Sequence, residues 1–132
     1  AEKSLLCKKE NIRLECDADG KSLEFMNPPD LYSLFGNALD NSIDAVRKLE
    51  DDDRAVEVSV KRRMNMVAIH IENRYSGELR FDGELPVTTK NDDKYHGYGM
   101  RSIRMIVDKY HGNMNIFASD GTFALDIILP LA

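Results

Sequence analysis

The chain has 132 residues, of which 42% are hydrophobic and 31% are charged, and its formal net charge is −5 at pH 7. This length fits one domain with a single core, and the composition is that of ordinary globular proteins. An acidic chain lacks the basic face that binds a phosphate backbone, so nucleic acid is not an expected partner.

Two cysteines, Cys7 and Cys16, match neither a metal-ligand spacing nor a disulfide framework, which favours a reducing cytosolic compartment. No apolar run approaches the length of a membrane-spanning helix, and no signal peptide is visible. Residues 1–10 resemble the end of a helix. We therefore expect them to be the end of a linker from a missing upstream domain, with the domain itself over 11–132.

The first predicted elements are a strand and a long helix. Alternating apolar residues predict the strand over 11–16, followed by a turn over 17–21. The helix is predicted from Pro28 to about Leu49, with one broad apolar face. Asn27 is the expected N-cap, and Pro28 suits the first helical position.

A β-hairpin is predicted next. Residues 56–60 and 67–71 alternate between apolar and polar, with a turn near Met64. Residues 73–98 then show little periodicity. A stretch of this length without clear secondary structure is uncommon in a compact domain and is typical of a functional lid, which we place at about 78–98.

A second helix is predicted to open at Gly99, with Gly112 as its left-handed C-cap. Two closing strands, 114–118 and 123–129, are joined by a turn over 119–121. This order of elements predicts a two-layer α/β (α+β) sandwich, with a mixed, mostly antiparallel sheet and helices on one face.

Asn37, Asn41 and Asp44 lie within a sector of roughly 60° along one edge of the apolar face of the first long helix. Mg²⁺ takes hard oxygen ligands and keeps several waters, so one or two protein oxygens are enough to bind it. The pattern therefore predicts a site for a hydrated magnesium ion that carries phosphates. The alternative is a polar helix face that is simply solvated.

The motif HGYGM, residues 96–100, places Gly97 and Gly99 where the long loop is expected to become a helix. Helix N-termini expose unpaired N–H groups that attract phosphate, and glycines let the backbone approach an anion closely. Alone, the motif is weak and favours a simple turn, but with the upstream asparagines it supports a nucleotide site. Lys90 and Arg101 are each expected either to contact phosphate oxygens or to remain in solvent.

Together these residues resemble the GHKL ATPase superfamily. The asparagine box is NALDNSIDA (37–45), the second glycine box is HGYGMRSIRMIV (96–107), and the last box is DGTF (120–123). The boxes occur in the superfamily's order and cover nearly the whole chain. TTK (88–90) followed by HGYGM is most similar to the ATP-binding domain of bacterial sensor histidine kinases, and the most similar subgroup is that of peptide-pheromone receptors of the accessory-gene-regulator type.

The resemblance implies a Bergerat-type fold that binds ATP and Mg²⁺. Asn41 is implied as the main metal ligand, Asn37 as an assisting ligand one turn earlier, and Asp44 as lining the pocket near the ribose or a bound water. Gly97 and Gly99 are implied to free backbone amides for the phosphates. The remaining residues implied to bind the nucleotide are Asn73, Gly77, Lys90, His96, Tyr98, Met100 and Thr122.

One box departs from the superfamily's pattern D-x-G-x-G, whose Asp accepts the adenine N6 hydrogens. The aligned segment, residues 73–77, reads NRYSG. Asn73 keeps a carbonyl oxygen acceptor but loses the charge, which costs about 1 kcal/mol of a charge-assisted bond. Tyr75 replaces a glycine, and Thr122 is implied to face the adenine. We expect nucleotide binding to be weakened and not abolished.

The implied activity is presentation of Mg²⁺·ATP for phosphoryl transfer to a histidine on the protein's own separate dimerisation domain. A response regulator is the implied next acceptor, and the full-length protein is implied to be a homodimer whose cytosolic portion belongs to a membrane-anchored receptor. None of His70, His96 and His111 fits the role of phosphoacceptor, since His70 alternates with core residues and His111 lies at a helix end. The fragment alone is therefore expected to be inactive.

Three alternatives stay open: a degenerate, non-catalytic nucleotide-binding or scaffolding module, an ATPase of the chaperone or repair kind, and a serine kinase of the anti-sigma-factor type. Hydrolytic members of the superfamily generally carry a Glu one turn before the magnesium Asn, where it activates water. Asn37 occupies that place, and a neutral amide is a poor general base, which favours transfer over hydrolysis.

Overall fold

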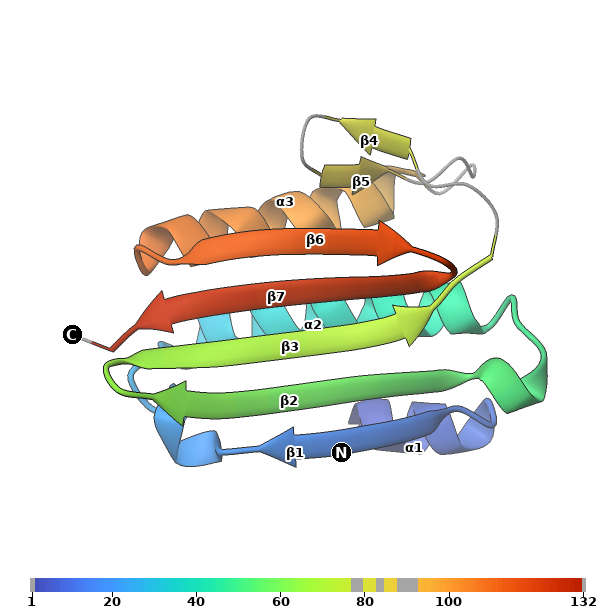
Figure 1. The fold of residues 1–132 in the computed structure, drawn as a ribbon, viewed down its shortest axis with the longest axis horizontal. Helices are drawn as coiled ribbons and strands as arrows, with labels where there is room; N and C mark the ends of the chain where they lie inside the picture. Colours follow the sequence, from blue (N-terminus) through green and yellow to red (C-terminus); the bar gives the residue numbers. More distant parts are fainter. Residues whose placement is uncertain (1, 77–79, 83–84, 88–92, 132) are drawn as a thin grey trace.

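The computed structural model describes residues 2–76, 80–82, 85–87 and 93–131. Figure 1 shows a twisted main sheet with helices behind it and a separate pair of short strands. The elements are α1 (Glu2–Lys9), β1 (Arg13–Ala18), η1 (Gly20–Leu23), α2 (Pro28–Val46), η2 (Asp51–Asp53), β2 (Ala55–Arg63), β3 (Met66–Arg74), β4 (Arg80–Asp82), β5 (Leu85–Val87), α3 (Asp93–Lys109), β6 (Asn113–Ser119) and β7 (Thr122–Pro130).

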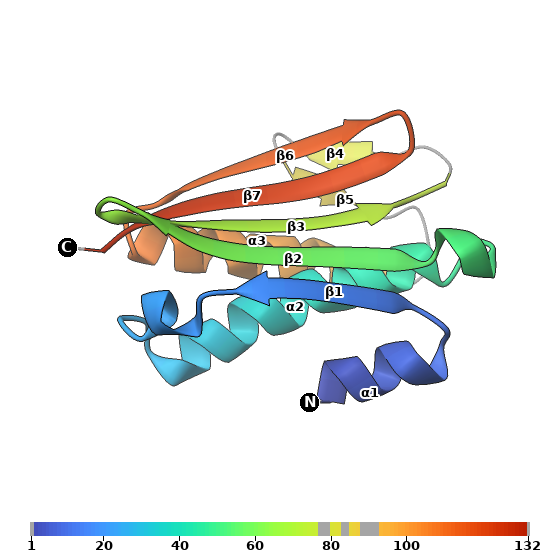
Figure 2. The same cartoon turned by 60° about the horizontal axis from the view of Figure 1, so that its bottom comes forward.

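Within the described residues, five strands form the main sheet in the order β1-β2-β3-β7-β6. β1 pairs with β2 in parallel, and the other neighbouring strands are antiparallel. Figure 2 shows α1, α2 and α3 on the same side of this sheet. These observations confirm the predicted two-layer sandwich with a mixed, mostly antiparallel sheet.

The core lies between the sheet and the helices α2 and α3. Alternate residues of β3 and β7 face the helices, because strand side chains have a period of two. Ile69, Ile71 and Ile127 are 1% exposed or less, and they belong to one buried cluster with Leu34 of α2 and Ile103 of α3. Full burial of each such side chain contributes about 1.5–3 kcal/mol. No helix in the described parts of the chain combines the length and hydropathy of a membrane-crossing segment.

Helix α2 begins where the sequence predicts, with Asn27 at the N-cap and Pro28 in the first turn, but it ends at Val46 and not at Leu49. Arg54 supplies the physical reason. Its guanidinium donates to the carbonyl oxygens of Arg47 (2.9 Å) and Leu49 (3.0 Å), so groups that would continue the helix ladder are bonded to a side chain instead.

The prediction that the second helix opens at Gly99 was wrong, because α3 begins at Asp93. Aspartate is favoured in the first turn of a helix, and no proline interrupts residues 94–98. Gly97 and Gly99 therefore lie in the second turn of α3, not at its start. The stretch 73–98, predicted to lack clear secondary structure, also contains β4 and β5, whose three residues each are too few to show a period.

Gly112 follows α3 as predicted, but the prediction that it adopts the left-handed conformation was wrong. The left-handed residue after α3 is His111, with φ of 59°, and this histidine lies beyond the helix and not in its last turn. Gly112 N–H donates to the carbonyl oxygen of Val107 (2.9 Å), which completes the helix end. A Cβ on Gly112 would lie 2.4 Å from Leu129 Cδ2 and 2.5 Å from the carbonyl oxygen of Ile128, so close packing against β7 requires the glycine.

Candidate functional site

Asn37 and Gly99 meet where α2 and α3 pack side by side. A Cβ on Gly99 would lie 3.5 Å from Asn37 Oδ1. Asn37 Nδ2 donates to Ser33 Oγ (3.2 Å) one turn earlier on α2, so the oxygen end of the amide is the end near Gly99. The fold thus joins the asparagine helix to the glycine motif, which are far apart in the sequence.

Asn41 and Asp44 occupy the following turns of α2 and are half-buried. Asn41 makes no side-chain hydrogen bond with any described residue. Asp44 Oδ1 accepts from Arg47 Nη1 (3.1 Å), and Arg47 Nε also donates to Glu10 (3.2 Å), which connects α2 to the segment after α1. The amide and carboxylate oxygens along this edge of α2 are of the kind that Mg²⁺ prefers.

Asn73 is a buried polar side chain, 3% exposed, at the end of β3. It lies opposite Phe123 on β7, and its position in the alternation faces the helices. Its Nδ2 donates to the carbonyl oxygen of Arg74 (2.8 Å), which fixes the orientation of the amide. Asn73 Oδ1 is then buried with no partner among the described residues. An unpaired buried acceptor costs about 1–3 kcal/mol, which a hydrogen-bond donor from a ligand would offset.

The segment after Asn73 is bonded to the turn between β6 and β7. Tyr75 N–H donates to the carbonyl oxygen of Gly121 (2.9 Å), and Gly121 has a φ of 79°, which favours glycine. Thr122 is half-buried and pairs with Arg74, so the strand alternation places it on the opposite face of the sheet from Asn73. The structure therefore does not bring Thr122 to the side of the sheet on which Asn73 lies.

The other predicted site residues do not gather at one place in the described structure. Met100 is 2% exposed and belongs to the core cluster. Arg101 is exposed on α3. The backbone of residues 96–98, which include His96, Gly97 and Tyr98, is helical, and Gly77 and Lys90 lie outside the described residues. The amides of Gly97 and Gly99 belong to a continuous helix in this structure, in contrast to the predicted helix start.

His70 lies on the sheet face away from the helices, as the alternation predicts. Its Nδ1 is 2.5 Å from Asp126 Oδ1, and its Nε2 is 3.1 Å from Glu72 Oε1. Burial lowers the pKa of His70, but the hydrogen bonds to Asp126 and Glu72 outweigh that effect, so the pKa is raised. Both ring nitrogens thus face carboxylate oxygens, which favours the imidazolium form, in which both nitrogens donate.

Sequence reasoning missed Tyr110, whose hydroxyl contacts the start of α2. It donates to Asp30 Oδ2 (2.6 Å), to which Lys109 Nζ also donates (2.7 Å). The ion pair with Lys109, followed by the Tyr110 hydrogen bond, lowers the pKa of Asp30. The sequence marks only Asp30, which stands three residues after the N-cap Asn27 with the spacing of a capping box, and it carries no sign of the tyrosine that contacts it.

A family model and a curated relative match this chain. The model of the GHKL domain matches residues 26–130. A probable C4-dicarboxylate sensor kinase of Bacillus subtilis (strain 168) is 24% identical over 116 residues, which cover 82% of this chain and 21% of that protein. The chain thus spans about a fifth of the length of this relative.

Solved structures share the fold. The nucleotide-free catalytic domain of histidine kinase ThkA is 16% identical, with a TM-score of 0.67 over 96% of this chain and 84% of that chain. The histidine kinase domain of a blue-light activated kinase from Erythrobacter litoralis EL346 is 14% identical, with a TM-score of 0.62 over 98% of this chain and 57% of that chain. Full-length ShkA in complex with AMPPNP is 11% identical, with a TM-score of 0.67 over 98% of this chain and 28% of that chain. At these identities the similarity shows the fold alone.

Proposed function

This chain belongs to the GHKL domain family, and on that basis we propose that it is the ATP-binding domain of a two-component sensor histidine kinase. The domain presents Mg²⁺·ATP to a histidine on the protein's own dimerisation domain, and a response regulator then receives the phosphoryl group. The sensor kinase relative and the histidine kinases of the same fold support this proposal. We further propose that the whole protein is a homodimeric, membrane-anchored receptor of the accessory-gene-regulator type, with this domain on the cytosolic side.

The observation that carries the proposal is the buried oxygen of Asn73, which has no partner within the described ranges of the chain. The amino group of adenine is a neutral N–H donor, and it satisfies a buried carbonyl acceptor without bringing a charge into the core. The opposite orientation of the amide is disfavoured, because Nδ2 already donates to the carbonyl oxygen of Arg74. In Figure 1 the end of β3 lies at the same end of the molecule as the start of α3, and we place the purine beside Asn73 with its phosphates toward α3.

The phosphate end of the proposed site is formed by α2 and α3. Asn41 and Asn37 would bind Mg²⁺ through their amide oxygens, and Asp44 lies one turn beyond Asn41 on the same edge of α2. The fit rests on two observations: the Asn37 oxygen is the end near Gly99, and the Asn41 amide makes no hydrogen bond with a described residue. Among the described residues, no group of three His, Cys, Asp or Glu could hold a metal, so the ion would keep most of its waters. When bound, Mg²⁺ neutralises negative charge on the phosphates.

The residues present favour transfer to a protein nucleophile. Asn37 stands where a general base would activate water, and a neutral amide does not take up that proton. Phosphoryl transfer to a histidine needs mainly positioning and charge neutralisation, which α2 and α3 can supply. His70 is engaged by two carboxylates on the far face of the sheet, so the accepting imidazole is expected to come from another domain.

The test is a titration with a non-hydrolysable ATP analogue and with the GTP counterpart, each with and without Mg²⁺. We expect Mg²⁺-dependent binding that prefers ATP, because guanine carries an acceptor where adenine carries the amino donor. Asn41→Ala should remove the Mg²⁺ dependence, and Asn73→Ala should weaken ATP binding about tenfold and reduce the preference over GTP. Asn115→Ala, exposed on β6, is the matched control and should bind like the wild type.

Binding that is absent, or equal with and without Mg²⁺, would remove the proposal and favour a scaffolding module. If Mg²⁺-dependent binding is found, the domain is mixed with a histidine-bearing dimerisation domain and labelled ATP. Acid-labile phosphate on that domain supports the histidine kinase, whereas acid-stable phosphate on a substrate protein indicates a serine kinase.

A further inference from the structure

The end of α3 caps the start of α2 through one hydroxyl group. Tyr110 Oη donates to Asp30 Oδ2 (2.6 Å) and accepts from the backbone N–H of Asn27 (2.9 Å). Asn27 is the N-cap residue of α2, yet its own side chain makes no capping hydrogen bond. Tyr110 therefore satisfies a backbone donor at the start of a helix that is distant in sequence.

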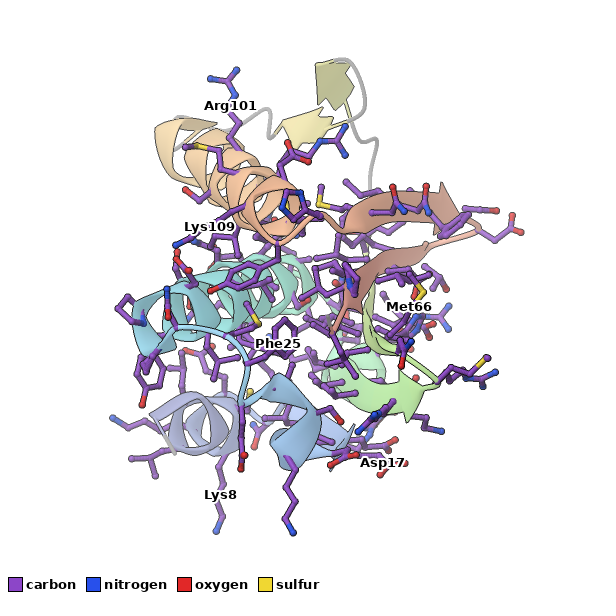
Figure 3. All side chains as sticks on the ribbon, turned by 90° about the vertical axis from the view of Figure 1, so that its left-hand side faces the viewer. Lys8, Asp17, Phe25, Met66, Arg101 and Lys109 are labelled. Carbon is purple, nitrogen blue, oxygen red and sulfur yellow. The ribbon has the colours of Figure 1, made fainter. Side chains whose placement is uncertain are left out.

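This arrangement is a capping box with a tyrosine inserted into it. In the usual box, the acidic residue at the third helical position reaches back to the N-cap N–H itself. Here Asp30 occupies that position, and the Tyr110 hydroxyl stands between its carboxylate and the N–H of Asn27. The ring of Tyr110 packs edge-on against Phe25, with centroids 5.8 Å apart and an interplanar angle of 87°. Figure 3 looks onto this end of the molecule and labels Phe25 and Lys109 beside α2.

The two helices are thus joined at two separated points. At one point Tyr110, just after the end of α3, meets Asn27 and Asp30 at the start of α2. At the other point Gly99, near the start of α3, meets Asn37 further along α2. The helices are therefore antiparallel, and the position of Gly99 beside Asn37 depends on where α3 lies along α2.

Apolar packing alone does not determine that axial position well. Burial of Ile103 and Val107 selects the face that α3 turns to the core, but hydrophobic contacts are non-directional. Hydrogen bonds, in contrast, weaken steeply when donor and acceptor move out of line. The paired bonds of the Tyr110 hydroxyl are therefore suited to fix α3 along its axis.

We propose that Tyr110 is a positioning residue of the nucleotide site, which holds α3 at the axial position where Gly99 meets Asn37. This inference rests on the proposed function, because it assigns the Asn37–Gly99 contact to nucleotide binding. Tyr110 lies just after the end of α3 and beside the start of α2, away from Gly99, so it acts on the site through α3. The hydroxyl group, with the oxygen of Asp30 that accepts from it, performs this role.

The first test replaces Tyr110 by Phe, which keeps the ring and its contact with Phe25 but removes the hydroxyl. We expect the dissociation constant of a Mg²⁺·ATP analogue to rise about fivefold to tenfold, as for the loss of a productive hydrogen bond. Asp30→Asn should preserve affinity, because the amide oxygen still accepts from Tyr110, whereas Asp30→Ala should behave like Tyr110→Phe. Lys109→Gln should change affinity by less than about twofold, because the Lys109 side chain is 54% exposed.

A control separates positioning from general stability. Val58→Ala in β2 removes buried methyl groups far from the cap and should lower the unfolding midpoint without weakening nucleotide binding. If Val58→Ala weakens binding as much as Tyr110→Phe does at similar stability, the tyrosine only stabilises the fold, and the proposal is refuted.

A second readout needs no nucleotide. The backbone amide resonance of Gly99 and the side-chain amide resonances of Asn37 should shift in Tyr110→Phe and stay in place in Val58→Ala. If the wild type binds no nucleotide, the proposed function fails, and these resonances still decide whether Tyr110 positions α3. Unchanged resonances in Tyr110→Phe overturn the positioning role.

Discussion

Glycine to alanine changes at Gly99 and Gly36 test two things together: whether Gly99 belongs to the nucleotide site, and whether α3 is a continuous helix through residue 99. Both glycines lie inside helices, Gly99 in α3 and Gly36 in α2. A Cβ at Gly99 would lie 3.5 Å from Asn37 Oδ1, which is ordinary van der Waals contact, and at Gly36 it would meet nothing within 4 Å. Neither alanine therefore has to displace a neighbour.

Each substitution should stabilise the protein, because a glycine inside a helix costs about 0.5–1 kcal/mol relative to alanine. For a domain of this size, that gain corresponds to a rise in the unfolding midpoint of roughly 2–5 °C. Nucleotide binding should separate the two variants. Gly99→Ala places a methyl group beside the oxygen end of Asn37 and should weaken binding of a Mg²⁺·ATP analogue about tenfold, whereas Gly36→Ala should bind like the wild type.

Thermal and denaturant unfolding measure the stability, and titration with the analogue measures the affinity. A Gly99→Ala variant that is stabilised and binds normally would show that the glycine is not needed by the nucleotide. A Gly99→Ala variant that is destabilised while Gly36→Ala is stabilised would contradict a continuous helix through residue 99.

Three further predictions concern stability. Gly112→Ala should destabilise the domain by about 2–3 kcal/mol in denaturant titration, because its Cβ would overlap Leu129 and the backbone of β7; a neutral effect would contradict the close packing. Arg54→Ala should cost about 1–3 kcal/mol, because the carbonyl oxygens of residues 10, 47 and 49 lose their donor, and Arg54→Lys should restore only part of this loss. The raised pKa of His70 means that its pairing stabilises the fold fully below the unfolded pKa of 6.5 and that this contribution is lost as pH rises through the folded pKa. The wild type should therefore exceed His70→Gln in unfolding midpoint by more at about pH 5.5 than at about pH 8.5, and a constant difference between the two proteins would refute the charged histidine.

The elements that the sequence predicted well are those with strong local signals. Asn27 and Pro28 mark the start of α2 by cap chemistry, and the alternation in β2 and β3 gives their pairing and the turn at Met64. The two-layer sandwich follows from these elements and their order, because each amphipathic face must be buried against another. The asparagines of α2 were likewise placed on one edge by helical rotation alone.

Other features depended on contacts between residues distant in the chain. Asp93 and not Gly99 begins α3, and Gly112 is needed for its packing on β7 and not for a left-handed turn. The register of β7 with β3 places Thr122 away from Asn73, and a shift of register by one residue would have reversed that outcome.

The sequence by itself determined which residues are candidates for a nucleotide site, since residue chemistry and helical or strand periodicity act over a few positions. Only the tertiary structure decided that Asn37 meets Gly99, that the buried Asn73 oxygen has no partner in the part of the chain that the structure describes, and that Tyr110 joins the two helices. These contacts depend on how the helices pack on one another and on the sheet, and directional hydrogen bonds across that packing have no signature in local sequence.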